Sequence, residues 1–150
     1  MDKMKMMLVD DEERFLETTK KLLERKGYQV ATALSGSEAL DKLQKENIQV
    51  VILDVKMPGM DGMTTLKAIK NRHPLVEVIM LTGHATVESA VEGLKSGAAD
   101  YLIKPTDIED LIRKAEDAYA KRQVLEEKIR GAQARMVTKS SSEKLQETKK

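Results

Sequence analysis

Hydrophobic and polar positions follow two patterns that alternate along most of the chain. Short apolar runs alternate with longer segments in which apolar residues recur every three or four positions. The first pattern is typical of buried strands and the second of amphipathic helices. The predicted strands are Met4–Asp10, Tyr28–Leu34, Val50–Asp54, Val76–Thr82 and Ala99–Lys104. Because each is followed by a helical segment, the pattern predicts repeated βα units and an α/β fold with a parallel sheet.

Turn and capping residues support these boundaries. Gly27 follows the charged helical segment Glu12–Lys26, at a position where a left-handed residue commonly ends a helix. Ser35 and Glu38 have the spacing of a capping box, which predicts that the next helix begins there. The turn-forming residues of Met57–Met60 and the pair Asp61-Gly62 mark the loop after the third strand.

The composition changes after about Tyr119, where the chain becomes rich in Lys, Arg, Glu and Gln. We therefore expect one domain over residues 1–120 and a helical extension with a polar tail over residues 121–150. We expect the last ten or so residues to be disordered, because they lack apolar side chains. The residues after Met136 are too few and too polar to form a DNA-binding unit, so the chain is either a stand-alone protein or a fragment of a longer one.

The last predicted helix also carries a heptad pattern. Apolar or core-type positions at alternating spacings of three and four are Ile108, Leu111, Ala115, Ala118, Arg122, Leu125, Ile129, Ala132 and Met136. One interpretation is an extended helix that pairs with a second copy of the chain. The other is a helix that covers the sheet and then frays, which Arg122 at a core-type position and Gly131 within the helix favour.

Composition excludes several classes of function. The 150 residues contain no cysteine, which excludes a disulfide framework, a thiolate zinc site and a cysteine nucleophile. No run approaches the roughly 20 apolar residues that span a bilayer, so we expect a cytoplasmic protein with no membrane partner. A formal net charge of +1 and 3% aromatic residues give no sign of nucleic-acid binding.

Polar residues stand where the predicted strands end. They are Asp10 and Asp11 at the end of the first strand, Asp54 at the end of the third, Thr82 at the end of the fourth and Lys104 at the end of the fifth. Each alone has an ordinary explanation, since an aspartate can simply end a buried strand and turn to water. However, the carboxyl ends of parallel strands meet at one edge of the sheet, where ligands of α/β proteins bind. We therefore expect these residues to converge on one site.

Three carboxylates so close together require a compensating charge, because like charges disfavour each other's ionisation. A hard divalent cation supplies that charge, and an all-oxygen cluster with room for water suits Mg²⁺. Lys104 adds a second positive charge, and Thr82 adds a hydroxyl donor. A site of this kind attracts a phosphoryl group.

The motifs VDDEE (Val9–Glu13), LDVKMPGMDG (Leu53–Gly62), LTGHA (Leu81–Ala85) and GAADYLIKP (Gly97–Pro105) resemble the receiver domain of two-component response regulators, in the same order and at similar intervals. The resemblance covers roughly residues 4–120. LTGHA and DVKMPGMDG are especially similar to receivers of σ54-dependent activators. The resemblance implies a doubly wound, flavodoxin-like sheet of five parallel strands in the order 2-1-3-4-5, with an extended C-terminal helix.

The resemblance also implies a role for individual residues. Asp54 would be the phosphoacceptor, Asp11 and Asp54 direct Mg²⁺ ligands, and Asp10 a ligand through metal-bound water. Lys56 would offer its backbone carbonyl to the ion. Thr82 would be the switch hydroxyl, Tyr101 the aromatic residue that changes rotamer, and Lys104 the phosphoryl contact, with a cis Lys104–Pro105 bond. Lys56 and His84 would modulate the lifetime of the phosphoryl group.

The implied function is that of a phosphoacceptor, not of a classical enzyme. The donor would be a sensor histidine kinase or a phosphotransfer protein, and the protein would assist its own phosphorylation and slow autodephosphorylation. The switch would control a downstream partner, and a homodimer is one expected assembly. The main alternative is a dimerisation or adaptor module that keeps the fold without being phosphorylated.

Two other classes fit the residues less well. A flavodoxin-like nucleotide binder needs a donor-rich phosphate loop after the first strand, where this chain has a DDEE sequence that repels phosphate. A haloacid-dehalogenase-type phosphatase has a second acid two residues after its nucleophile, where this chain has Lys56.

Overall fold

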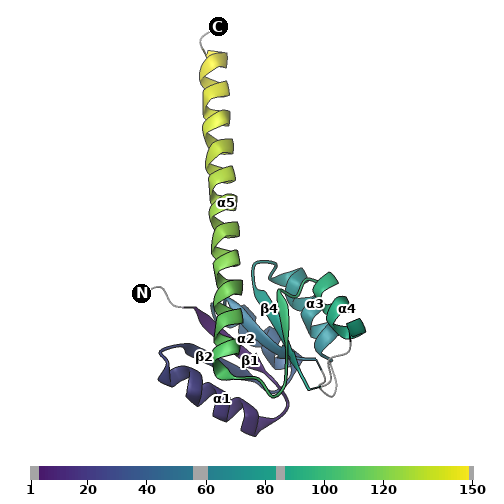
Figure 1. Cartoon of the computed structure of the whole chain (residues 1–150). Coiled ribbons are helices and arrows are strands. Elements are labelled where there is room, and N and C mark those ends of the chain that lie inside the picture. The colour runs from purple at the N-terminus through teal and green to yellow at the C-terminus, as the bar shows by residue number, and fades with distance from the viewer. Residues whose placement is uncertain (1–3, 56–60, 84–86, 149–150) are drawn as a thin grey trace.

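In a computed structural model of the chain, five parallel strands form one sheet with helices on both faces (Figure 1). The structure describes residues 4–55, 61–83 and 87–148, with side chains as far as Met136. The strands are β1 (Lys5–Val9), β2 (Gln29–Ala33), β3 (Val50–Asp54), β4 (Glu77–Thr82) and β5 (Asp100–Ile103). Their order is β2-β1-β3-β4-β5, and all neighbours are parallel. The predicted fold and strand order are therefore confirmed.

The helices connect the strands in the predicted βα alternation. They are α1 (Glu13–Arg25), α2 (Gly36–Lys45), α3 (Gly62–Arg72), α4 (Val87–Lys95) and α5 (Ile108–Thr148). The predicted cap is present, since the Ser35 hydroxyl accepts a hydrogen bond from the Glu38 amide at 3.1 Å. The Glu38 carboxylate accepts from the amide of Leu34, one residue before the cap, at 3.0 Å. Gly27 has a φ of 95°, which is the left-handed conformation expected after α1.

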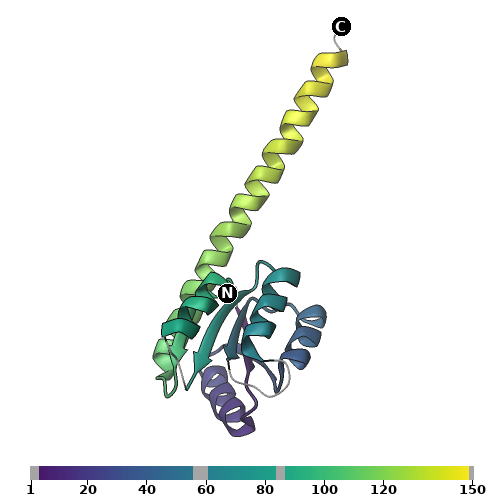
Figure 2. The same ribbon diagram turned by 90° about the vertical axis from the view of Figure 1, so that its right-hand side faces the viewer.

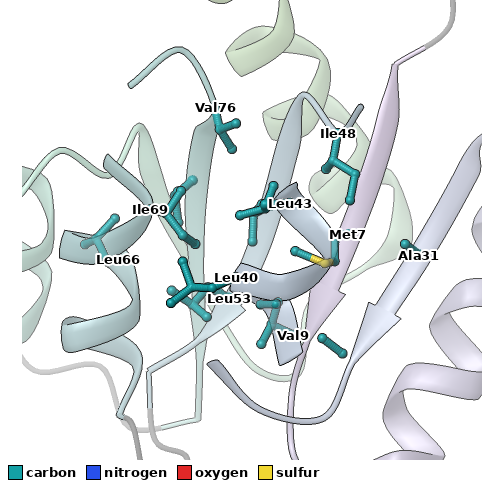
Figure 3. Packing of buried hydrophobic residues seen from close by; sticks show 14 of the residues in the cluster. Met7, Val9, Ala31, Leu40, Leu43, Ile48, Leu53, Leu66, Ile69 and Val76 are labelled. Carbon is teal, nitrogen blue, oxygen red and sulfur yellow. The ribbon is translucent and has the colours of Figure 1, made fainter. Parts of the chain in front are cut away.

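The hydrophobic core consists of two clusters, one on each face of the sheet. In the first, Leu40 and Leu43 of α2 and Leu66 and Ile69 of α3 gather over the strands (Figure 3). In the second, α1 and α5 cover the opposite face with Leu16, Leu23, Leu111, Ala115 and Ala118. Because both faces are covered, the strands are mainly apolar, and most of their polar residues stand at the strand ends.

Helix α5 continues far beyond the sheet as a single helix to Thr148 (Figures 1 and 2). Leu111, Ala115 and Ala118 are buried against the sheet, whereas Leu125 and Ile129 are exposed. The predicted extended helix is therefore confirmed, while the division at residue 120 and the disorder of the last residues stay predictions. Within the described residues, no helix is long and apolar enough to cross a membrane.

Candidate functional site

The strand register brings the predicted site residues to one edge of the sheet. Val9 pairs with Leu53, so Asp10 and Asp54 both follow directly at the carboxyl ends of neighbouring strands. On the next pair, Thr82 lies opposite Ile103. The Lys104 amide, one residue further, donates to the Thr82 carbonyl at 2.8 Å. Residues from four strands therefore lie around one point, although they span nearly a hundred positions of the sequence.

The three aspartates form a compact acidic cluster. Asp10, Asp11 and Asp54 each offer a carboxylate oxygen, and these oxygens lie within 4.8 Å of one another. Asp10 is 1% exposed and Asp54 is 7% exposed, whereas Asp11 faces solvent. The Asp10 carboxylate also accepts a hydrogen bond from the Glu12 amide at 2.9 Å, which fixes its orientation. The predicted convergence of these three side chains is confirmed.

Lys104 supplies the cation nearest to this cluster among the described residues. Its ammonium lies 2.5 Å from Asp10 Oδ2 and 3.7 Å from Glu12 Oε1, and 4.3 Å from the centre of the Phe15 ring. Burial opposes the charged form, but the hydrogen bond to Asp10 and the charges of Asp10, Asp54 and Glu12 outweigh it and raise the pKa of Lys104. The ammonium is therefore charged at neutral pH. The Lys104–Pro105 peptide bond is cis, as predicted.

Thr82 and Tyr101 lie on the neighbouring strands β4 and β5. Thr82 ends β4 and is 4% exposed, so its side chain lies within the site edge and not in solvent. Tyr101 lies on the neighbouring strand β5, opposite Met80, and packs half-buried against the first core cluster. Lys56 and His84, the two residues predicted to modulate the site, lie outside the described residues.

The donor set fits a hard divalent cation. All three acids of the cluster offer carboxylate oxygen, and the described part of the site adds no sulfur or imidazole donor. Oxygen ligands of this kind suit Mg²⁺, which keeps several waters and binds through one or two carboxylates. The exposed side of the cluster, at Asp11, leaves access for those waters.

Two residues at the start of α3, Asp61 and Gly62, have structural roles that the sequence did not indicate. The Gly62 amide donates to the Val55 carbonyl at 2.9 Å, one residue beyond Asp54. A Cβ atom at Gly62 would lie 2.4 Å from Val55 Cα, so only glycine allows this approach. The Asp61 carboxylate caps α3 by accepting from the Thr64 amide at 2.7 Å. The Asp-Gly pair, interpreted from sequence as a loop, is therefore the start of α3.

Glu12 and Phe15 were also missed. Both stand on the turn and first part of α1, and their contact with Lys104 joins opposite ends of the domain's sequence. No local pattern predicts such a contact. The one available signal was that Phe15 is the only phenylalanine in the chain.

An acidic cluster beside a lysine, at the carboxyl edge of a 2-1-3-4-5 parallel sheet, is the architecture of a receiver domain. The chain belongs to the response regulator receiver domain family, which matches residues 6–116. The predicted resemblance to this family is confirmed.

The relatives include transcriptional regulators. The chain is 42% identical over 119 residues to the transcriptional regulatory protein ZraR of Escherichia coli K12, covering 79% of this chain and 27% of that protein. It is 40% identical over 105 residues to the DNA-binding transcriptional regulator NtrC of Klebsiella pneumoniae, covering 70% of this chain and 22% of that protein. These relatives confirm the predicted similarity to receivers of σ54-dependent activators.

Among solved structures, a CheY-like response regulator receiver domain protein from Methanospirillum hungatei JF-1 superposes with a TM-score of 0.77 at 32% identity. The match covers 81% of this chain and 98% of that one. By contrast, the chain spans only about a quarter to a third of the length of the curated ZraR relatives. The similarity to those regulators therefore concerns only that part of their length.

Proposed function

We propose that this receiver domain is phosphorylated on Asp54 by a sensor histidine kinase or a phosphotransfer protein. The observation that carries the proposal is the convergence of Asp10, Asp11 and Asp54 within 4.8 Å, with the Lys104 ammonium beside them. Such a cluster is costly to maintain without a cation or phosphoryl group to bind, because like charges repel. A cytoplasmic location follows from this role, since sensor kinases use ATP as their phosphoryl source.

In the proposed reaction, Asp54 is the nucleophile. One oxygen of its carboxylate attacks phosphorus, the bond from phosphorus to the donor's histidine nitrogen breaks, and that nitrogen keeps the electron pair and takes up a proton. Asp54 ends a strand whose five residues are all buried, so its carboxylate is held rigidly for an in-line approach. The Lys104 ammonium neutralises the charge that spreads over the phosphoryl oxygens.

Mg²⁺ is the proposed cofactor. Asp11 and Asp54 would hold the ion directly, Asp10 would hold it through water, and the Lys56 carbonyl would complete the protein ligands. When bound, the ion supplies positive charge that offsets the negative charge of the carboxylates and of the incoming phosphoryl group. Asp10 and Lys104 already pair, so part of the cluster's charge is balanced by the protein itself.

The proposed output is a conformational switch on the β4–β5 side of the sheet. Thr82 would donate its hydroxyl to the phosphoryl group on Asp54, and the space it leaves would admit the ring of Tyr101. Two features support this coupling. Thr82 is buried beside the site, and Tyr101 packs half-buried on the adjacent strand. Phosphorylation would thus shift a two-state equilibrium of the helix α4 face towards the form that its partner recognises.

The experiment is intact-mass spectrometry after incubation with acetyl phosphate and Mg²⁺. We expect the wild-type chain to gain one phosphoryl group and Asp54→Asn to gain none, because the amide is not a nucleophile. Asp41→Asn is the matched control, since Asp41 is an exposed aspartate on α2, and it should be phosphorylated normally. Removing Mg²⁺ with EDTA should prevent uptake in all variants. Uptake by Asp54→Asn at the wild-type rate would refute the assignment.

A second candidate function is dimerisation without phosphorylation, and one observation favours it. On the extended part of α5, Leu125, Ile129 and Met136 are 42%, 39% and 69% exposed and follow the heptad spacing. We use "α5 stripe" for these three residues. Apolar side chains in a heptad pattern are typical of paired helices. Under this alternative the chain pairs equally well whether or not Asp54 is phosphorylated, which is the property that distinguishes the two functions.

A further inference from the structure

Three groups surround the ammonium of Lys104. Asp10 and Glu12 face it with carboxylates at 2.5 and 3.7 Å, and the Phe15 ring lies 4.3 Å away, measured from the nitrogen to the ring centre. The Lys104 side chain is 17% exposed. Phe15 stands on the first turn of α1 and packs partly buried against the second core cluster, so its ring is held in place by the domain.

The two carboxylates are not equivalent anchors for this lysine. Asp10 belongs to the acidic cluster, so a bound cation competes with Lys104 for its charge. Glu12 has a side chain that is 68% exposed, and a solvent-exposed ion pair of this kind is weak. The remaining charge that acts on Lys104 is that of Asp54, which belongs to the same acidic cluster. The ammonium therefore needs a further anchor whenever a cation occupies that cluster.

The Phe15 ring has the properties of that anchor. The face of an aromatic ring attracts an ammonium through its quadrupole within about 6 Å of the ring centre. A ring does not bind Mg²⁺ in competition with carboxylates, so this attraction persists when the acidic cluster is filled. It also leaves the ammonium free to donate hydrogen bonds on its open side.

We propose that Phe15 is a positioning residue, which holds the Lys104 ammonium at the edge of the acidic cluster while Asp10 exchanges that ammonium for a cation. The consequence for phosphoryl uptake rests on the proposed function, whereas the contact itself does not. The competing explanation is that Phe15 only fills the core between α1 and the sheet. The positioning role requires an aromatic ring at residue 15, whereas core filling requires only an apolar side chain of similar size.

The first arm of the test measures the contact by NMR, without any phosphoryl donor. In wild-type protein with ¹³C-labelled lysine, the ε-methylene signal of Lys104 should be shifted by the ring current of Phe15. The shift should persist on adding Mg²⁺, should remain in Phe15→Tyr and should vanish in Phe15→Leu. Lys104→Met assigns the signal by removing it. A Lys104 signal without ring shift in the wild type with Mg²⁺ would overturn the proposal.

The second arm measures the rate of phosphoryl uptake from acetyl phosphate. Phe15→Leu should slow uptake by about threefold to tenfold, the size of one cation–π contact, and Phe15→Tyr should stay within about twofold of wild type. In a Lys104→Met background, Phe15→Leu should cause no further slowing. Equal slowing in that background, or equal slowing by Phe15→Tyr and Phe15→Leu, would assign Phe15 to the core alone.

Leu16→Val is the control for stability. Leu16 is the neighbouring residue of α1, is 3% exposed and has no contact with Lys104 among those described. This variant should lower the urea midpoint without slowing uptake, so that loss of rate in Phe15→Leu is separated from loss of stability. If the wild type takes up no phosphoryl group at all, the proposed function fails, and the NMR arm alone decides whether Phe15 holds the ammonium.

Discussion

At the scale of single residues, repulsion among the carboxylates of the acidic cluster lowers the free energy of unfolding. Asp10 is balanced by Lys104 and by the Glu12 amide. Asp11 and Asp54 add two further charges within 4.8 Å. The cluster is therefore an arrangement that favours binding at the expense of stability, as is common at functional sites.

This repulsion predicts that removing one charge stabilises the metal-free protein. Asp11→Asn and Asp54→Asn should each raise the free energy of unfolding in EDTA by about 1 kcal/mol or more. Urea denaturation provides the measurement, with Asp41→Asn as the control that removes an exposed acid elsewhere. Adding Mg²⁺ should reduce or reverse the gain, because the cation balances the wild-type cluster. Lower midpoints for both variants in EDTA would show that the cluster is not repulsive.

Asp61 has a structural task at the start of α3. Its carboxylate accepts from the Thr64 amide, and hydrogen bonds from the Thr64 backbone and side chain lower the pKa of Asp61, although slight desolvation of this exposed group acts in the opposite direction. Asp61→Ala should lower the free energy of unfolding by about 1 kcal/mol, the usual value of an N-cap. Asp61→Asn, which keeps an oxygen acceptor, should lower the free energy of unfolding much less.

The pH dependence of that loss follows from the direction of the pKa shift. A carboxyl group whose pKa is lower in the folded state contributes stability above its unfolded pKa, and that contribution disappears as the pH falls through the folded value. The difference between wild type and Asp61→Ala in urea should thus be full at pH 7 and shrink below about pH 4. A difference that stays constant down to pH 2 would contradict the ionised cap.

At the scale of elements, Arg122 marks the place where α5 leaves the domain. Its side chain is 14% exposed, its Nε lies 2.6 Å from Glu126 Oε1, and its guanidinium donates to the Ile48 carbonyl at 3.4 Å. From sequence, Arg122 counted against the heptad interpretation because a charge at a core-type position disfavours pairing. The structure gives it another role, since it fastens α5 to the connection between α2 and β3.

If the α5 stripe pairs with a second copy, Arg122 also limits where pairing begins. Arg122→Leu removes the charge at the start of the stripe, so self-association should become tighter, by at most about tenfold, which is the effect of burying about one leucine side chain. Arg130→Leu is the matched control, because it adds the same side chain at an exposed position outside the heptad spacing. If both variants tighten association equally in sedimentation equilibrium, the effect is non-specific hydrophobic association and not pairing in the heptad register.

The elements themselves were predictable because strands buried on both faces leave a plain signature of apolar runs. The positions of Asp10, Asp54, Thr82 and Lys104 followed from that signature, since parallel strands all end at one edge. What the sequence could not provide were contacts between residues far apart in the chain. Phe15 meets Lys104 only because the start of α1 and the residue after β5 both lie at the carboxyl edge of the sheet, and nothing near either residue indicates the other.

At the scale of the whole molecule, helix α5 connects the domain that carries the site to the α5 stripe, the expected surface for pairing with a second copy. The α5 stripe lies beyond the sheet, whereas the first part of the same helix packs on the sheet through Leu111 and Ala115. A change in the domain can therefore reach the stripe through one continuous helix (Figure 2). We expect self-association through the stripe to depend on phosphorylation.

The prediction is tested on the full chain by sedimentation velocity, with and without acetyl phosphate and Mg²⁺. Ile129→Asp should abolish association, because it places a charge within the stripe. Val124→Asp is the control, since Val124 is an exposed apolar residue outside the heptad spacing, and it should leave association unchanged. A wild-type chain that stays monomeric at micromolar concentration in both conditions would exclude pairing through α5.

The central claim, that Asp54 is the phosphoacceptor, is tested most directly by chemical trapping. After incubation with acetyl phosphate and Mg²⁺, sodium borohydride reduces an acyl phosphate to an alcohol, which converts the modified aspartate into homoserine. Proteolysis and mass spectrometry then locate that residue in the sequence. We predict homoserine at position 54 and at no other aspartate. Homoserine at Asp10 or Asp11, or its absence throughout, would contradict the account.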